Sequence, residues 1–280
     1  MLSTSYEDRL HRVRDYIYDH PAEDLSLDRL ADVAAMSRFH WHRVFRSMTG
    51  ETCAQAVRRM RMHRAACWLV QTDMSLEEVG AACAYPQPAS FARAFREAYG
   101  LSPGAFRKRG EHVSPLPFPD RKDHSMFDVT IRNEPDYRLA AIPHRGPYNE
   151  IGKCFDKCAT IFSARNLWPY ARGMIGVYYD DPHQTAAKDL RSHAGVIVPE
   201  TASVPEDMED ITLAGGRAGV LRFVGPYAGL SAAYDYLYGV WLRESGEEPR
   251  NAPAYENYLN HPQDTKPDDL VTEICLPLSG

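Results

Sequence analysis

SLDRLADVA at residues 26–34 and SLEEVGAAC at residues 75–83 are two copies of one pattern in the first half of this 280-residue chain. Each copy begins with a serine, a preferred N-cap residue, and continues with apolar residues at helical spacing. A small residue, Ala31 or Gly80, occupies the same place in both copies, where a second helix can approach closely. The two copies therefore predict a duplicated helical unit.

A second repeated element follows each copy, RVFR at residues 43–46 and RAFR at residues 93–96. After a short turn, this element predicts a second helix, and a helix-turn-helix unit places its second helix in the major groove of DNA. Four side chains of the first unit are expected to face bases and phosphates: Arg38, Phe39, His42 and Arg43. Four apolar residues at helical spacing are expected in the core: Val44, Phe45, Phe91 and Phe95.

The stretch between the two units, residues 53–71, has the pattern of one amphipathic helix. At 1.5 Å per residue this helix is roughly 28 Å long. That length suits two recognition helices about one turn of DNA apart, roughly 34 Å, on one face of the duplex.

Charge is distributed unevenly along the chain, whose net charge is -6. Residues 1–110 hold 16 Lys and Arg against 13 Asp and Glu, a net charge of +3, so residues 111–280 carry -9. Within the first half, residues 38–64 contain seven arginines and one acid, Glu51. Because the guanidinium group matches phosphate geometry, this basic stripe is compatible with a nucleic-acid partner for the first half. A run of charge by itself is more often a solvated face, so charge alone does not decide between the two.

The two halves meet at KRGEHVSPLPFPDRKDH, residues 108–124, which contains three prolines and no hydrophobic periodicity. Such composition is typical of an extended linker. We therefore expect an all-α domain over residues 1–110, a linker over residues 111–125 and an α+β domain over residues 126–280.

Several classes of protein are disfavoured. No apolar run is long enough to cross a bilayer, and the first 20 residues lack the apolar core of a signal peptide, so we expect a cytoplasmic protein. The six cysteines form no C-x-x-C pair, and two histidines two residues apart on a helix, His40 and His42, cannot face one metal. With no Ser-His-Asp order and no phosphate-binding glycine loop, we expect no catalytic residues, metal or cofactor.

The second half also repeats. HRGPYNEI at residues 144–151 aligns with FVGPYAGL at residues 223–230, and each predicts a strand, a Gly-Pro-Tyr turn and a helix. Apolar or aromatic segments that predict further strands follow each helix, at residues 174–179, 194–199, 254–259 and 270–278. Two β-α-β-β repeats of this kind form a pseudo-twofold concave sheet with both helices on one face.

Residues 9–109, which end in FARAFREAYGLSPGAFRKR (residues 91–109), resemble the DNA-binding domain of the AraC/XylS family of transcription regulators. The resemblance implies recognition helices from Arg38 to Phe45 and from about Pro88 to Phe95. The residues implied to contact DNA are Arg38, Phe39, His42, Arg43, Arg46, Gln87, Ser90 and Arg93. Two neighbouring positions, Ala89 and Ala92, carry no hydrogen-bonding group. The second helix-turn-helix is therefore expected to contribute mainly phosphate contact and docking.

Residues 126–278 resemble the GyrI-like effector-binding domain through the paired Gly-Pro-Tyr turns, GVYYDDP at residues 176–182 and YENYLNHP at residues 255–262. The resemblance implies that Glu256 lies among aromatic residues in a cleft and meets cationic, aromatic ligands. A spacing of two places Glu256 and Tyr258 on one face of a strand. The effector-binding residues expected are Tyr148, Trp168, Tyr178, Tyr227, Glu256 and Tyr258. The alternatives are that several of these tyrosines are core residues and that Glu256 is a solvated acid at a sheet edge.

Together these patterns predict a ligand-responsive transcription regulator that binds double-stranded DNA and a cationic small molecule, with RNA polymerase as a further candidate partner. An enzymatic alternative is a small-molecule hydrolase in which Glu256 and a tyrosine, Tyr148 or Tyr227, activate water. A third is a sequestering protein whose first half no longer binds DNA.

Overall fold

The computed structural model describes residues 6–110 and 127–280, so the expected linker lies outside the described residues. The chain divides into two compact units. The first unit comprises the described residues up to Arg38 and from Thr49 to Gly110, and the second comprises Phe39–Met48 together with the described residues from Phe127 onward. A short segment of the predicted helix-turn-helix therefore packs with the second unit. No helix in the described parts of the chain is long and apolar enough to span a membrane.

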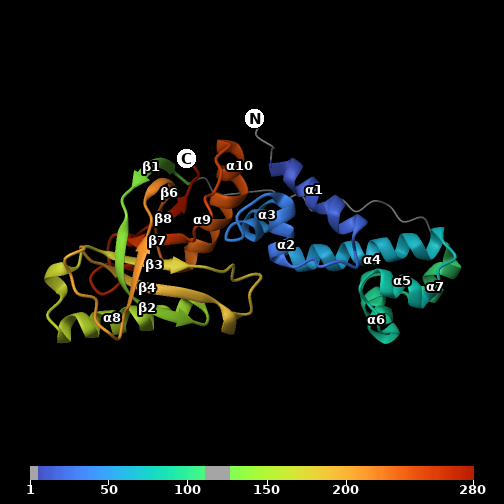
Figure 1. Ribbon diagram of the computed structural model, residues 1–280, viewed down its shortest axis with the longest axis horizontal. Helices are drawn as coiled ribbons and strands as arrows, with labels where there is room; N and C mark the ends of the chain where they lie inside the picture. The colour runs from blue at the N-terminus through green and yellow to red at the C-terminus, as the bar shows by residue number, and fades with distance from the viewer. Residues whose placement is uncertain (1–5, 111–126) are drawn as a thin grey trace. The chain divides into compact units, whose positions relative to one another are not determined.

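The first unit is entirely helical, as predicted (Figure 1). Ser26 and Ser75 are both N-caps, since their hydroxyls accept hydrogen bonds from the backbone N–H groups of Arg29 and Glu78. The helices of this unit are α1 (Tyr6–Asp19), α2 (Leu27–Ala34), α4 (Cys53–Gln71), α5 (Leu76–Ala82), α6 (Pro88–Tyr99) and α7 (Pro103–Arg109).

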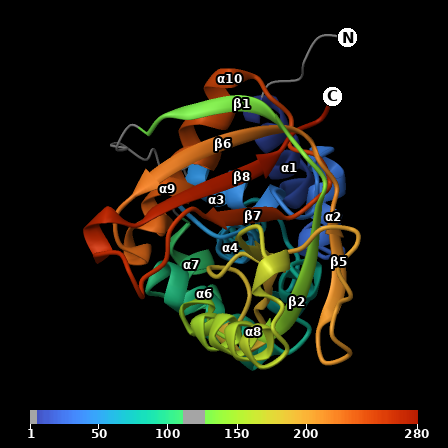
Figure 2. The ribbon, with the colours of Figure 1, turned by 90° about the vertical axis from the view of Figure 1, so that its left-hand side faces the viewer.

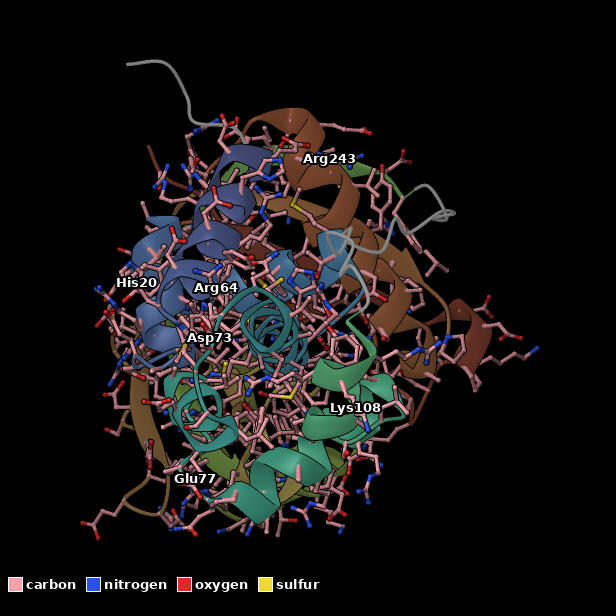
Figure 3. All side chains as sticks on the ribbon, turned by 90° about the vertical axis from the view of Figure 1, so that its right-hand side faces the viewer. His20, Arg64, Asp73, Glu77, Lys108 and Arg243 are labelled. Carbon is pink, nitrogen blue, oxygen red and sulfur yellow. The ribbon has the colours of Figure 1, made fainter. Side chains whose placement is uncertain are left out.

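The central helix of this unit is α4, which contacts α1, α5, α6 and α7. Because helices pack around it, α4 buries residues on more than one side. The prediction of an amphipathic helix with one apolar face was therefore wrong. Gly80 permits the predicted close approach, since a Cβ atom there would lie 3.2 Å from the ring of Phe91 on α6. The outer surface is polar, with Asp73, Glu77 and Lys108 exposed (Figure 3).

The second unit is built on one antiparallel sheet of eight strands, in the order β1-β6-β8-β7-β3-β4-β2-β5. Figure 2 shows β1, β6, β8 and β7 side by side in this order. The strands are β1 (Val129–Glu134), β2 (Tyr137–Arg145), β3 (Met174–Tyr178), β4 (Arg191–Ile197), β5 (Glu209–Leu213), β6 (Gly216–Val224), β7 (Ala254–Tyr258) and β8 (Val271–Pro277). The segments expected to be strands after each helix are confirmed as β3, β4, β7 and β8. The sheet is pseudo-twofold about the β3–β7 pair.

Each repeat has one more strand than the sequence pattern indicated. The additional strands, β1 and β5, open the two repeats and exchange partners, because β1 pairs with β6 and β5 pairs with β2. Both lie at the edges of the sheet and are largely exposed. Hydrophobic alternation is weak in such strands, which explains why the pattern did not reveal them.

Each Gly-Pro-Tyr turn connects a strand to a helix, as predicted. Gly146 and Gly225 have φ values of +138° and +137°, which side chains disfavour, so glycine is required at the turn. The helices that follow are α8 (Gly152–Ala164) and α9 (Leu230–Tyr236), and α9 continues through a π-helical turn (Leu237–Trp241) into α10 (Leu242–Ser245). The segment that joins this unit from the first half forms α3 (Trp41–Thr49).

The two faces of the sheet bury different side chains. Helix α8 packs its buried residues Cys158, Ile161 and Phe162 against apolar residues of β2 and β4. On the other face the curled sheet brings its own side chains together, from Leu139 on β2 to Cys275 on β8. The helices and the curled sheet therefore enclose two separate apolar layers.

Gly219 on β6 lies where the sheet meets the helix that follows the second turn. A Cβ atom at this position would lie 2.6 Å from the ring of Trp241. We expect Gly219→Ala to lower the free energy of unfolding by about 1–3 kcal/mol because the ring must shift. Urea unfolding followed by circular dichroism measures this. Gly152→Ala, where nothing lies within 4 Å, is the control and is expected to be no less stable than the wild-type chain. Equal stability of the two variants would contradict the packing argument.

Candidate functional site: a tyrosine cleft in the second unit

A cavity in the second unit has a volume of about 760 Å³. It lies between α8 and α9 above the centre of the sheet, and α3 contributes to its wall. We call it the tyrosine cleft after the aromatic residues that line it, Tyr148, Tyr178, Tyr227, Tyr234, Tyr238 and Tyr258. The sequence-predicted effector residues all line this one cavity, including Trp168 and Glu256.

Glu256 lies at the bottom of the cleft on β7 and is only 5% exposed. Its two carboxylate oxygens accept hydrogen bonds from different tyrosines: Tyr258 donates to Oε2 at 2.8 Å and Tyr234 donates to Oε1 at 3.1 Å. The Tyr258 hydroxyl is in turn 2.7 Å from that of Tyr178. The expectation that Glu256 and Tyr258 share a face is confirmed, and the alternative of a solvated acid is excluded by the burial.

The network sits on the pseudo-twofold axis of the sheet. Gly176 on β3 is paired directly with Glu256 on β7, so the two occupy equivalent positions of the two repeats. Tyr178 and Tyr258 are also equivalent and meet across the axis. A Cβ atom on Gly176 would lie 2.8 Å from the Tyr258 hydroxyl and 2.9 Å from that of Tyr178. Glycine at this position therefore makes room for the tyrosines and leaves Glu256 as the carboxylate between the two central strands.

Burial governs the protonation of this network. Desolvation raises the pKa of Glu256 above its usual range, although hydrogen bonds from Tyr258 and Tyr234 and the charge of Arg43 oppose the shift. Desolvation and the charge of Glu256 together raise the pKa values of Tyr178, Tyr234 and Tyr258 well above 10. At neutral pH the three tyrosines are therefore neutral donors, and the carboxylate is the group whose charge responds to pH.

The wall and rim of the cleft are aromatic. Tyr148 packs edge-on against Tyr178 with ring centroids 4.9 Å apart, and Tyr227 packs edge-on against Tyr258 at 5.6 Å. These two belong to the paired Gly-Pro-Tyr turns. Trp168 is 41% exposed, and its indole N–H donates to Ser163 Oγ. The rim therefore presents ring faces and edges from both repeats.

Sequence reasoning missed Tyr234 and Tyr238, which come from the helix rather than from a strand. Their rings stack with an interplanar angle of 8° and centroids 6.4 Å apart. The signal available was their spacing of four on one helix, which places both on one face. The π-helical turn beginning at Leu237 changes the register at this point, and such turns are frequent at functional sites.

Helix α3 differs from the expected recognition helix in two ways. It begins at Trp41, after Arg38, and its outward positions are not free: His42 is 7% and Arg43 9% exposed. The His42 Nδ1 atom lies 3.3 Å from Asp181 Oδ2 in the second unit. The expectation that His42 and Arg43 face outward is therefore wrong in this structure, because both point into the second unit. The residues expected in the core, Val44, Phe45, Phe91 and Phe95, are all buried as predicted.

The start of α6, in the first unit, is the exposed counterpart of α3. Gln87, Ser90 and Arg93 are all exposed there. Arg93 lines a shallow surface hollow together with Ala89, Ala92, Arg96 and Glu97. Arg38 is exposed as well, and Phe39 is half-buried.

The contacts of the cleft fit ligand binding better than water activation. The Tyr148 hydroxyl is bonded to the backbone of Asp180, accepting from its N–H and donating to its carbonyl oxygen. Within the described residues no hydrogen bond joins Tyr148 or Tyr227 to Glu256, so the tyrosine–carboxylate pair considered for a hydrolase does not form. No cluster of metal-ligating side chains occurs in the part of the chain that the structure describes. What remains is a carboxylate surrounded by ring faces.

Comparison with known families gives two matches. Residues 127–279 match the GyrI-like small molecule binding domain, and residues 30–109 match a helix-turn-helix domain.

Individual relatives match one part of the chain or the other. The HTH-type transcriptional regulator YbfP of Bacillus subtilis is 29% identical over 102 residues, which are 36% of this chain and 35% of YbfP. This chain thus spans about a third of the length of YbfP. The probable transcriptional regulator YgiV of Escherichia coli is 29% identical over 157 residues, which are 55% of this chain and 97% of YgiV. Among solved structures, the cryo-EM structure of an EcmrR–DNA complex is 16% identical with a TM-score of 0.47, covering 55% of this chain and 57% of that one.

The buried carboxylate predicts a dependence of stability on pH. Because the pKa of Glu256 is raised by folding, the unfolded chain loses this proton first as pH rises. The free energy of unfolding therefore falls through the window between the ordinary and the raised pKa, and then becomes level. Glu256→Gln removes this contribution, so we expect its stability relative to the wild-type chain to improve as pH rises through that window. Urea unfolding of both proteins from pH 4 to pH 8 tests this, and a pH-independent difference would contradict it.

Proposed function

Because this chain belongs to the family of the GyrI-like small molecule binding domain, we propose that it is a DNA-binding transcription regulator whose second unit binds a cationic, aromatic effector. The observation that carries the proposal is the buried carboxylate of Glu256 at the bottom of the tyrosine cleft.

A cation is the ligand that suits this site. A buried carboxylate has lost water and gains most from an opposite charge placed beside it. Tyrosine ring faces attract cations through their quadrupole, and a flat aromatic ligand also buries apolar area between them. The volume of about 760 Å³ accommodates a ligand of drug size.

DNA binding is supported by the helix-turn-helix region in the first unit. The exposed start of α6 presents Gln87, Ser90 and Arg93, and Arg96 lies beside them. Arginine at such a position contacts phosphates or guanine edges in a bidentate way. The residues of α3 that the sequence assigns to DNA contact are the other half of the proposed interface.

Loss of the arginine on α6 tests the DNA-binding function. We expect Arg93→Ala to lower the affinity for sequences selected from a random DNA pool by about tenfold, as for one lost bidentate contact. Fluorescence anisotropy at fixed salt concentration measures this. Arg243→Ala, which removes an exposed arginine of α10 in the second unit (Figure 3), is the control and should leave the affinity unchanged. If Arg93→Ala also binds as tightly as the wild-type chain, α6 does not contact DNA.

Loss of the carboxylate tests the effector site. We expect Glu256→Gln to weaken binding of a rhodamine cation by about tenfold or more, the order of one lost charge-assisted contact. Affinity of the wild-type chain should rise with pH as Glu256 ionises, whereas that of the glutamine variant should not. Titration of dye fluorescence measures both. A neutral dye of similar size should bind the two proteins equally. Unchanged cation affinity in the variant would exclude Glu256 from the site.

A further inference from the structure

One cation already occupies part of the tyrosine cleft. The guanidinium of Arg43, on α3, lies 5.0 Å from the ring centroid of Tyr234 and 5.5 Å from that of Tyr238. It donates to the Tyr238 hydroxyl at 3.3 Å and to the backbone carbonyl oxygen of Asp180 at 3.1 Å. With 9% of its surface exposed, Arg43 is held as a ligand would be, on ring faces and by hydrogen bonds.

The charge of Arg43 is matched by the acids of the cleft. Desolvation raises the pKa of Glu256, and the positive charge of Arg43 opposes this rise; the same charge favours the ionised form of the neighbouring Asp181. A planar cation that stacks on tyrosine rings near a buried carboxylate has the chemistry proposed above for the effector. Arg43 and an effector cation therefore compete for the same ring faces and the same negative charge.

Other residues on and beside α3 also contact the helix that follows the second Gly-Pro-Tyr turn. His40, which immediately precedes α3, is hydrogen-bonded to the Tyr238 hydroxyl at 2.8 Å, and Arg46 on α3 pairs with Asp235 at 3.3 Å. Gly239 keeps α3 close, since a Cβ atom there would lie 2.8 Å from the Cβ of Ser47. Side chains engaged in these contacts cannot at the same time donate to phosphates or base edges.

We propose that Arg43 is a built-in ligand of the tyrosine cleft, and that an effector cation displaces it and so releases α3 for contact with DNA. This inference rests on the proposed function, since it needs both the effector site and the DNA-binding role of α3. If the effector displaces Arg43, effector binding and DNA binding are coupled. Each ligand then raises the affinity of the protein for the other ligand by the same factor.

The decisive measurement is the coupling between a rhodamine cation and DNA in the full chain. We expect saturating cation to increase DNA affinity about tenfold, within the usual range of coupling between two sites. In Arg43→Met the cation should bind more tightly and no longer change DNA affinity, although DNA binding itself is weaker. If the cation binds the wild-type cleft and DNA affinity is unchanged or reduced, the proposal is overturned.

A second variant distinguishes the proposal from simple misfolding, because the proposal predicts that this variant binds DNA more tightly. Tyr238→Phe keeps the ring but removes the hydroxyl that holds Arg43 and His40, so DNA affinity without effector should rise by about three- to tenfold, the value of one or two hydrogen bonds. Tyr236→Phe, a buried tyrosine of the same helix, is the matched control and should not change it. An unchanged or reduced DNA affinity in Tyr238→Phe would contradict the proposal.

Hydrogen exchange of the wild-type chain provides a test without mutation. The amides of α3 should exchange faster when the cation is bound, and unchanged exchange would contradict release of α3. Failure of the proposed function gives a different result, because then neither the wild-type chain nor Arg43→Met binds the cation, or Glu256→Gln binds it equally well.

Discussion

A carboxylate buried at the bottom of a cleft constrains the structure around it. Glu256 would be costly to bury alone, and the fold supplies two tyrosine hydroxyls that donate to it, one from the same strand and one from α9. The Tyr258 hydroxyl needs space above the sheet, which Gly176 provides. Both donating hydroxyls also need to remain protonated, which burial ensures. Strand pairing, the choice of glycine and the placement of α9 all follow from this one buried charge.

The internal repeat explains both the symmetry of the cleft and its single departure from symmetry. Equivalent tyrosines of the two repeats, Tyr178 and Tyr258, meet at the axis, and the two Gly-Pro-Tyr turns contribute one tyrosine each to the rim. Strict symmetry would place a second glutamate opposite the first, and two carboxylates in contact cannot both ionise. With glycine in its place, the tyrosines of both repeats remain and Glu256 has no second glutamate beside it at the axis.

Local patterns in the sequence predicted much of this architecture. Ser26 and Ser75 are N-caps because capping depends on residues three positions away, and the strands after each helix were visible through their apolar or aromatic composition. The edge strands β1 and β5 were missed because their exposure erases the alternation. Tyr234 and Tyr238 were missed because their place in the cleft depends on the packing of their helix against the sheet, which spacing along one element does not report.

The burial of α3 could not be predicted from any local pattern. Its basic, helical sequence predicts exposure toward DNA, and nothing within the helix indicates that Asp180, Asp181 and Tyr238, far along the chain, receive it. The contact has a physical reason nonetheless. A cleft that holds a carboxylate for a cation is unfavourable when no cation is present, and Arg43 supplies one. An effector must then bind better than a guanidinium already in place, so its apparent affinity is reduced by the population in which Arg43 occupies the cleft. A cation with more aromatic area than arginine would meet that condition, so the proposed displacement of Arg43 predicts selectivity for large aromatic cations.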